Sequence, residues 1–483
     1  FTEANVIFIQ IEIEKINAIA ALPFVSYVGL QNLNDTPLNY KGVGKHAVTS
    51  LLSPSGKNLS GKGIVVGVGD NAEIVTQHID FNARVINRVP FPFSLHGTHV
   101  SGTVAGAGLL DAKNNGMAPR ATIVSQYMSD IITTAPTYVT DYNMVVTNNS
   151  YTNAEAGCVG TGTYDVVSNY VDKQMGDYDK LLHVFSAGND GRNTCAPYPL
   201  SFATIKSGYQ VAKNVLTVGA VDTLYAAASF SSRGPVRDGR IKPEIMATGV
   251  NVFSTKHFFT YEKSSGTSMS GPMVAGVATL LNEQYRKLNS GAVPQAALIK
   301  AVLCNTAEDL GNAGPDFGNL NARRAAETIE NNRFYLSTTA PSTNAIAVPA
   351  GTRRLKVMLY WADTAAAPNA ATQLINDFDL TVVAPGNITH QPLILNPTPL
   401  NVNNNAVEGV DRINNIEQVV INNPIAGNYD INVNAFALPY GPQEYVVTYQ
   451  IDTNGVTVEY PFGEEKFVPG EIEEIRWNAY GDE

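Results

Sequence analysis

The chain has 483 residues, too many for one ordinary core, so its length predicts two or three domains, and its 44% hydrophobic content predicts that they are globular. The formal net charge is −11 without any basic cluster, which argues against nucleic acid and anionic membrane surfaces as partners. No apolar run reaches the length needed to span a membrane. Charged residues make up 16% of the chain, which favours an extracellular over a cytosolic protein.

Residues 1–40 are predicted to form a separate piece. Residues 6–13 partly alternate apolar and polar side chains, which predicts a strand, and residues 24–30 predict a second strand. Residues 15–22 between them have helical spacing. A β-α-β fragment this short cannot bury a core alone, so we expect it to dock on a larger unit.

Between about residues 60 and 330, short apolar runs alternate with helical stretches. The runs are rich in β-branched residues and cover residues 64–68, 122–124, 181–185 and 215–218, while residues 99–106, 164–176 and 272–286 have helical spacing. Continuous apolar strands separated by helices predict an α/β fold, a parallel sheet with helices on both faces. Functional groups in such sheets gather at the carboxyl ends of the strands.

The residue pattern changes after about residue 336. Strand-like runs then alternate with Pro, Asn and Gly turns and no helical pattern, which predicts an all-β sandwich; the runs are residues 355–361, 378–383, 417–421, 429–433 and 444–449. The acidic stretch 457–483 is either a linker or the first strands of a further β domain. We therefore divide the chain into residues 1–40, 41–335, 336–456 and 457–483.

Ser268 stands where an apolar helix is predicted to begin, with Pro272 in the first turn. A lone serine at such a position is most simply explained as a helix N-cap. The positive end of a helix dipole, with its free backbone N–H groups, is also a good place for an attacking hydroxyl and a developing oxyanion.

Three upstream segments supply the groups that an attacking serine needs. Asp70 follows the apolar run 64–68, His96 opens a helix, and Asn189 lies in a glycine-rich bend after the run 181–185. Acyl transfer requires a base for the serine proton, a carboxylate that orients the imidazole, and donors aimed at the oxyanion. His96, Asp70 and Asn189 together with the Ser268 N–H have the chemistry for these roles.

The sequence motifs around these residues resemble those of the subtilisin-like serine proteases. The similar motifs are His96-Gly97-Thr98-His99-Val100, Ser186-Ala187-Gly188-Asn189 and Gly266-Thr267-Ser268-Met269, in the family's order Asp, His, Asn, Ser over residues 58–330. The resemblance implies a catalytic triad of Asp70, His96 and Ser268, with Asn189 as oxyanion donor. It also implies that residues 336–456 are the jelly-roll domain of a subgroup of large bacterial subtilases.

The resemblance implies two substrate-binding segments. Asn149, Ser150 and Tyr151 match the edge strand that pairs with the substrate backbone, and Ser186, Ala187 and Gly188 match the opposite side of the first specificity pocket. Asn71-Ala72 departs from the family, which usually has Thr or Ser and then Gly after the catalytic aspartate. Asn71 can still form local hydrogen bonds, so we expect the enzyme to remain active. The sequence leaves open the geometry of the loop that follows Asp70.

Residues 1–30 resemble the last part of the family's propeptide, and residues 31–40 would then enter the cleft. The alternative is an ordinary N-terminal extension packed on the catalytic domain. We predict processing between Leu30 and Lys41.

Other polar residues have simpler explanations. Asp80 is a rival to Asp70 but lacks a preceding strand, and His78, His99 and His183 are expected to be structural. Cys158 and Cys195 could pair in an oxidising compartment, whereas Cys304 lies in an apolar helical pattern and is expected to be a buried thiol. Residues 376–379 and 411–417 could bind a structural calcium ion, but turn capping explains them as well; no metal ligand is assigned.

We therefore expect a secreted, bacterial serine endopeptidase that is made as a zymogen and needs no cofactor for catalysis. Its partners would be protein or peptide substrates and its own propeptide, with no nucleic acid or membrane. A non-catalytic binding protein that kept the fold is the alternative, against which all four catalytic residue types argue. An α/β-hydrolase esterase is excluded because Ser268 lacks the Gly two places later that a nucleophile elbow requires.

Overall fold

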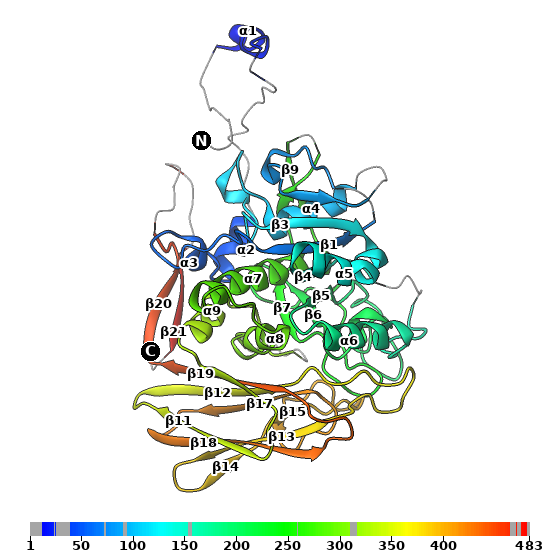
Figure 1. Cartoon of the computed structure of the whole chain (residues 1–483), viewed down its shortest axis with the longest axis vertical. Helices are drawn as coiled ribbons and strands as arrows, with labels where there is room; N and C mark the ends of the chain where they lie inside the picture. The colour runs from blue at the N-terminus through cyan, green and yellow to red at the C-terminus, as the bar shows by residue number, and fades with distance from the viewer. Residues whose placement is uncertain are drawn as a thin grey trace.

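A parallel sheet forms the centre of the molecule in this computed structural model, which describes residues 12–23, 25, 39–71, 74–89, 94–152, 157–257, 259–309, 316–463, 470 and 475–480. Within these ranges seven strands pair in the order β2-β3-β1-β4-β5-β6-β7, every neighbouring pair being parallel (Figure 1). They are β1 (Val65–Asp70), β2 (Val85–Asn87), β3 (Thr122–Tyr127), β4 (Met144–Asn149), β5 (Leu182–Ser186), β6 (Leu216–Val221) and β7 (Ile245–Thr248).

Helices cover both faces of this sheet, as the alternating pattern predicts. One face carries α5 (Met128–Tyr142) and α6 (Val166–Asp177), and the other carries α4 (Leu95–Ala105) and α7 (Thr267–Leu288). The remaining helices are α1 (Ile16–Ala20), α2 (Asn39–Lys45), α3 (Thr49–Leu52), α8 (Ala296–Asn305) and α9 (Ala322–Glu330), with short 3₁₀ turns η1 (Ile13–Lys15), η2 (Ile79–Phe81), η3 (Ala112–Asn114) and η4 (Tyr209–Val211).

Strand β1 illustrates how the sequence divides its side chains between the two faces. A Cβ built on Gly67 or Gly69 would come within 3.0 Å of Ile131 in α5, so these positions have room for glycine alone. Successive side chains of a strand point to opposite faces, which places Asp70 on the face opposite to these glycines. That face is covered by α4, the helix that carries His96.

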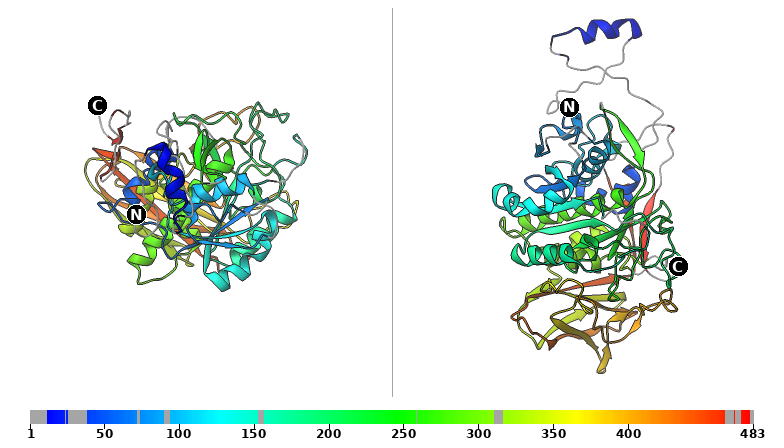
Figure 2. Two further views of the ribbon diagram at one scale, coloured as in Figure 1. Left: turned by 90° about the horizontal axis from the view of Figure 1, so that it is seen from above. Right: turned by 90° about the vertical axis from the view of Figure 1, so that its right-hand side faces the viewer.

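Two antiparallel four-stranded sheets form the C-terminal sandwich, as predicted (Figure 2). One sheet contains β10 (Phe334–Ser337), β19 (Tyr445–Thr453), β12 (Thr352–Tyr360) and β17 (Ile416–Asn422); the other contains β11 (Ser342–Val348), β18 (Gly427–Ala437), β13 (Asp377–Ala384) and β14 (Ile388–His390). Alternation along β12 sends Val357 into the core shared by the two sheets, and sends Met358 and Tyr360 into the core of the catalytic region. The sandwich is therefore packed against the region that carries the site.

Three small two-stranded hairpins complete the part of the fold that the structure describes. They are β8 (Val252–Thr255) with β9 (Tyr261–Ser264), β15 (Leu393–Ile394) with β16 (Val407–Glu408), and β20 (Gly455–Tyr460) with β21 (Arg476–Tyr480). The last hairpin falls in the stretch that the sequence left open between a linker and further strands. Its Tyr460 ring lies against Gly44 of α2, which connects this hairpin to the catalytic region.

The N-terminal piece is described only in part. Helix α1 confirms the helical spacing of this region, whereas the two predicted strands lie outside the described residues, apart from Glu12, the 3₁₀ residue Ile13 and Val25. None of the α1 residues is buried, and Figures 1 and 2 show this helix apart from the rest of the molecule. The docking expected for this piece is thus not seen in its described part.

Among the residues that the structure describes, no helix combines the length and the apolar character that crossing a bilayer would require.

Candidate active site

Asp70 and His96 meet above the carboxyl end of β1. The Nδ1 atom of His96 lies 2.7 Å from Oδ2 of Asp70. The other carboxylate oxygen, Oδ1, accepts a hydrogen bond from the backbone N–H of Asn71 at 2.8 Å and one from the Ser94 hydroxyl at 3.4 Å. Asn71 therefore holds the carboxylate through its backbone, and the departure from the family sequence at this position leaves the aspartate oriented toward His96.

Ser94 also fixes the start of the helix that carries His96. Its Oγ accepts a hydrogen bond from the backbone N–H of Gly97 at 3.1 Å, the contact expected of an N-cap. Helix α4 consequently begins at Leu95, before the helical spacing that starts at residue 99. His96 lies in its first turn beside Asp70, which confirms the prediction that His96 opens a helix.

The charge of His96 is governed by its carboxylate partner. Burial disfavours the imidazolium, but the hydrogen bond to Asp70 and the negative charge of Asp70 outweigh it, so the pKa of His96 is raised above its ordinary 6.5. Because Nδ1 faces an acceptor-only carboxylate, the proton of the neutral ring belongs on Nδ1. The other nitrogen, Nε2, is then left free to accept a proton.

Ser268 is the second residue of α7, not its N-cap. The helix begins at Thr267 after the cap residue Gly266, so Pro272 lies in the second turn and the expectation of a first-turn proline is wrong. Pro272 has no N–H to donate to the Ser268 carbonyl four residues earlier. That carbonyl instead accepts a hydrogen bond from the Ser150 hydroxyl at 3.1 Å, which compensates for the missing helical bond.

The link between Ser150 and Ser268 is reciprocal. The Ser268 hydroxyl donates to the backbone carbonyl of Ser150 at 3.3 Å, while Ser150 Oγ also accepts from the Asn148 amide at 3.0 Å. The predicted substrate strand after β4 is therefore bonded directly to the predicted nucleophile. The Ser268 hydroxyl hydrogen is thus directed at Ser150, and it must be redirected to His96 before Ser268 can attack.

Asn189 is held with its amide nitrogen available. Its Oδ1 accepts hydrogen bonds from the backbone N–H of Thr267 at 2.9 Å and from the Thr267 hydroxyl at 3.1 Å. A Cβ built on Gly266 would lie 3.5 Å from Nδ2 of Asn189 and 3.7 Å from the Ser268 nitrogen. The two predicted oxyanion donors thus face the same small space.

The predicted substrate segments flank this space. The side chain of Asn149 is fully buried and donates to Thr147 Oγ1 at 2.8 Å and to the Val184 carbonyl at 3.1 Å, so Asn149 can meet a substrate only through its backbone. The Tyr151 hydroxyl donates to Asn149 Oδ1 at 3.1 Å, and burial raises the pKa of Tyr151 well above 10. Tyr151 therefore stays uncharged in the segment that is predicted to bind substrate.

The opposite segment is held by the start of α7. The Ser186 hydroxyl donates to the Thr267 carbonyl at 2.7 Å, and the Gly188 N–H donates to Thr267 Oγ1 at 3.1 Å. Ala187 is fully buried between them. Thr267 consequently orients both this segment and Asn189, a role that sequence reasoning missed although the residue stands inside a recognised motif.

The alternative acid and the other histidines lie outside the site. Asp80 accepts from the Tyr261 hydroxyl through both carboxylate oxygens at 3.0 Å, so it is engaged elsewhere. Burial lowers the pKa of His99 to about 4 and that of His183 to about 3. His78 Nε2 bonds to the Thr260 carbonyl at 3.1 Å. These contacts are structural, as expected.

The cysteines follow the two expectations. Cys158 and Cys195 form a disulfide with 5.4 Å between their Cα atoms. Cys304 is fully buried, and burial raises the pKa of its thiol to about 12. The disulfide joins the segment after the substrate strand to the segment after Asn189.

The proposed calcium segments show turn and ion-pair contacts. Asp411 Oδ1 accepts from the backbone N–H groups of Ile413 and Asn414 at 2.7 and 3.0 Å, and Asp379 pairs with Arg412. Among the residues that the structure describes, no group of three or more His, Cys, Asp or Glu is arranged to hold a metal. Calcium binding stays an expectation of the sequence.

Comparison with known proteins places this chain in a family. The model of the subtilase family matches residues 61–319. Subtilisin DY of Bacillus licheniformis is 32% identical over 232 residues, which cover 45% of this chain and 72% of that protein. Thermitase of Thermoactinomyces vulgaris is 27% identical over 285 residues, covering 55% and 90%.

A solved structure agrees on the fold. The CspB protease of Clostridium perfringens aligns with a TM-score of 0.53 and 18% identity, covering 60% of this chain and 99% of that one. The chain belongs to the subtilase family, as the resemblance of its motifs implies. It is a subtilisin-like serine endopeptidase.

Proposed function

We propose that Ser268 is the nucleophile of this endopeptidase, with His96 as general base and acid and Asp70 as the residue that orients His96. The observation that carries the proposal is the 2.7 Å contact between His96 Nδ1 and Asp70 Oδ2. It keeps the Nδ1 proton in place and leaves Nε2 to take the Ser268 proton during attack. His96 then passes this proton to the leaving amine.

The tetrahedral intermediate carries a negative oxygen that needs donors. Asn189 Nδ2 and the Ser268 N–H supply them, because Thr267 holds the opposite end of the Asn189 amide. Collapse of the intermediate leaves an acyl group on Ser268 Oγ. Water activated by His96 then releases the acid product and restores the hydroxyl, and no cofactor takes part.

The substrate is a protein or peptide backbone held between two segments. Asn149, Ser150 and Tyr151 would pair with it on one side, and Ser186, Ala187 and Gly188 would line the other side of the first pocket. The enzyme would be secreted by a bacterium, for which the Cys158–Cys195 disulfide is support because such bonds persist in oxidising compartments. Residues 1–40 would be the remnant of an inhibitory propeptide, removed between Leu30 and Lys41.

A Ser268→Ala variant tests the nucleophile. Wild-type protein should hydrolyse casein and react with a fluorophosphonate probe, and peptide mapping should locate the probe on Ser268. The variant should do neither while melting at a similar temperature. Equal casein hydrolysis by both proteins would remove Ser268 from the mechanism, and an inert wild type would favour a non-catalytic binding protein.

The zymogen proposal has its own test. Active enzyme should begin between residues 31 and 41 on N-terminal sequencing, and purified Ser268→Ala protein should retain Phe1 if the enzyme processes itself. Active enzyme that still begins at Phe1 would reject processing at this junction.

A further inference from the structure

We propose that Gln210 is a positioning residue that sets the width of the first specificity pocket, and so the side chain accepted just before the scissile bond. This inference rests on the proposed function, since it concerns the two segments that flank the nucleophile. Gln210 lies in η4, 58 residues before Ser268 in the chain, and belongs to no motif that the sequence singled out.

Strands β4 and β5 separate just where the pocket is expected. Their parallel pairing ends at Asn149 opposite Phe185. Beyond this pair, the chain continues into Ser150–Tyr151 on one side and Ser186–Gly188 on the other. A pocket between the two segments requires that they stay apart by a defined distance without a ladder of backbone hydrogen bonds.

The Gln210 side chain bridges this gap. Its Nε2 donates to the Tyr151 carbonyl at 2.7 Å and to the Ser186 carbonyl at 3.2 Å. Only the amide nitrogen can face two carbonyl oxygens, so the orientation of the amide follows from its partners. One side chain therefore ties together both segments that are proposed to bind substrate.

Burial makes this tie costly to lose. Gln210 is fully buried, and its Oε1 has no hydrogen-bond partner among the described residues. Removing the amide would leave two carbonyl oxygens without this donor in a buried setting, which is unfavourable. The segments would be expected to move in order to find other partners or water, and the pocket would change shape.

Gln210 is itself held rigidly. Its backbone carbonyl accepts from the Thr217 hydroxyl at 3.0 Å, and the carbonyl of Val211 accepts from Arg240 Nη1 at 2.8 Å. The neighbouring Tyr209 ring stacks on Phe185 with 5.1 Å between centroids. The amide is thus fixed before substrate arrives.

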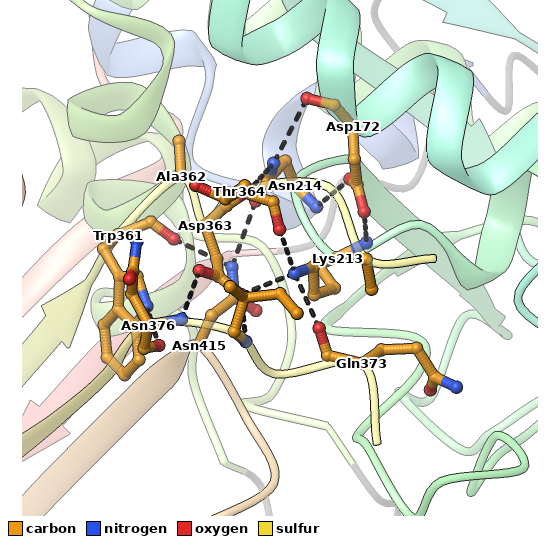
Figure 3. A network of polar contacts seen from close by, with 12 residues as sticks. Asp172, Lys213, Asn214, Trp361, Ala362, Asp363, Thr364, Gln373, Asn376 and Asn415 are labelled. Carbon is orange, nitrogen blue, oxygen red and sulfur yellow. Dashed lines mark hydrogen bonds and ion pairs between the residues drawn. The ribbon is translucent and has the colours of Figure 1, made fainter. Parts of the chain in front are cut away.

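The same segment is anchored in the sandwich. Lys213, three residues after Gln210, pairs with Asp363 and donates to the Gln373 carbonyl at 2.7 Å (Figure 3). Arg240 Nη2 reaches Gln373 Oε1 at 3.3 Å. Asp363 and Gln373 both lie in the connection between β12 and β13. The C-terminal sandwich therefore supports the segment that carries Gln210.

The test compares Gln210→Met with Gln284→Met. Methionine has a similar volume but no donor, so the bridge is lost without a large cavity. Gln284 is a matched control: it is buried, donates Nε2 to the Ala326 carbonyl at 3.1 Å, and its Oε1 likewise has no partner within the described part of the chain. It lies in α7 roughly 24 Å along the helix from Ser268.

The measurements are kcat and KM for a peptide library varied at the residue before the scissile bond, together with the rate of fluorophosphonate labelling. Gln210→Met should lower kcat/KM for the preferred residue by roughly 10-fold or more, mainly through KM, and change the order of preference. Labelling of Ser268 does not need a side chain in the pocket, so its rate should fall by a smaller factor than kcat/KM for the preferred residue. Gln284→Met should keep the wild-type order of preference.

The outcomes separate this inference from the proposed function. A wild type that neither cleaves nor labels would end the proposed function. An active wild type with the same preference profile in all three proteins would overturn the role of Gln210. If Gln210→Met does not fold, Gln210→Glu decides, because a carboxyl group has at most one hydrogen and cannot serve both carbonyls; its profile should shift, and an unchanged profile overturns the proposal.

Discussion

The carbonyl of Ser268 accepts a hydrogen bond from the Ser150 hydroxyl at 3.1 Å, and the hydroxyl of Ser268 donates to the Ser150 carbonyl at 3.3 Å. Two hydrogen bonds therefore connect the proposed nucleophile to the proposed substrate strand. The proposed chemistry of Ser268 depends on His96, Asp70 and Asn189, whose contributions can be separated by experiment.

Replacing Asp70 with Asn should lower kcat by roughly 10⁴-fold. An asparagine amide would donate to His96 Nδ1 and hold the imidazole in the tautomer whose Nε2 already carries a proton, so His96 could not accept from Ser268. The measurement is kcat on a peptide substrate at saturating concentration. The melting temperature serves as the control for folding, and a loss below about 10-fold would contradict the orienting role.

The pH dependence of kcat/KM should report His96. The base must be neutral, and its pKa is raised above 6.5, so activity should fall with decreasing pH and reach half its maximum above pH 6.5. In Asp70→Asn the midpoint should move to lower pH, because both favourable interactions with the carboxylate are removed. An identical midpoint in the two proteins would show that another group controls the profile.

The same raised pKa has a consequence for stability. A group that binds its proton more tightly when folded stabilises the protein fully below its unfolded pKa, and this contribution disappears as pH rises through the folded pKa. Unfolding of wild type and Asp70→Asn in urea should therefore differ more at pH 5.5 than at pH 8. A difference that is independent of pH would argue against the His96–Asp70 interaction as its source.

Asn189→Asp should remove the oxyanion donor while keeping the contacts to Thr267. The retained Oδ1 can still accept from the Thr267 N–H and hydroxyl, but an oxygen replaces the donating nitrogen. We expect kcat to fall by roughly 10²–10³-fold or more, with KM changed only a few-fold. A change confined to KM would indicate that Asn189 binds substrate and does not stabilise the oxyanion.

Loss of the Cys158–Cys195 disulfide should destabilise the protein. The bond closes a loop across a sequence separation of 37 residues, and the chain-entropy relation gives about 4 kcal/mol for a loop of this size. Urea unfolding of the Cys158→Ser, Cys195→Ser double variant measures the difference. Peptide mapping without reductant is the control, and two free thiols in the wild type would reject the bond.

Lys356 should make stability increase with pH. It is buried beneath the sandwich sheet and donates to the Ala307 carbonyl at 2.7 Å; burial, with a smaller contribution from Arg354, lowers its pKa to about 7. Between pH 7 and the unfolded value of 10.5 the unfolded state binds more protons, so raising the pH through this window favours the folded state. Urea unfolding of Lys356→Met should show a smaller rise, because burial also lowers the pKa of Lys242 to about 7 and that contribution remains. A parallel profile in both proteins would contradict the contribution of Lys356.

Local sequence was sufficient for the frame of the site. Asp70 follows a β-branched apolar run whose alternation forces the aspartate onto one face, and His96 precedes a helical pattern, so both positions follow from short-range rules. The sandwich was also predictable, because apolar alternation and turn residues are properties of each strand by itself. Residues 336–456 needed no knowledge of their neighbours for that assignment.

The start of α7 shows where local rules end. Proline usually occupies the first turn, which is where the sequence predicted Pro272, yet the helix begins at Thr267 and Pro272 lies in its second turn. The Ser268 carbonyl that Pro272 leaves unbonded finds its partner in Ser150, 118 residues away in the chain. No sequence pattern around Pro272 could reveal that the donor is Ser150, which follows β4.

The sequence by itself therefore determined the class of the enzyme and nominated the groups that are proposed to react, because both follow from residue type and order along the chain. Only the tertiary structure decided which buried polar groups connect the segments around the site. Gln210 and the Lys213–Asp363 pair carry no local signal, since their stability comes from partners far apart in sequence. A buried amide or ammonium is tolerated only when the folded chain brings acceptors to it, and that condition is a property of the fold.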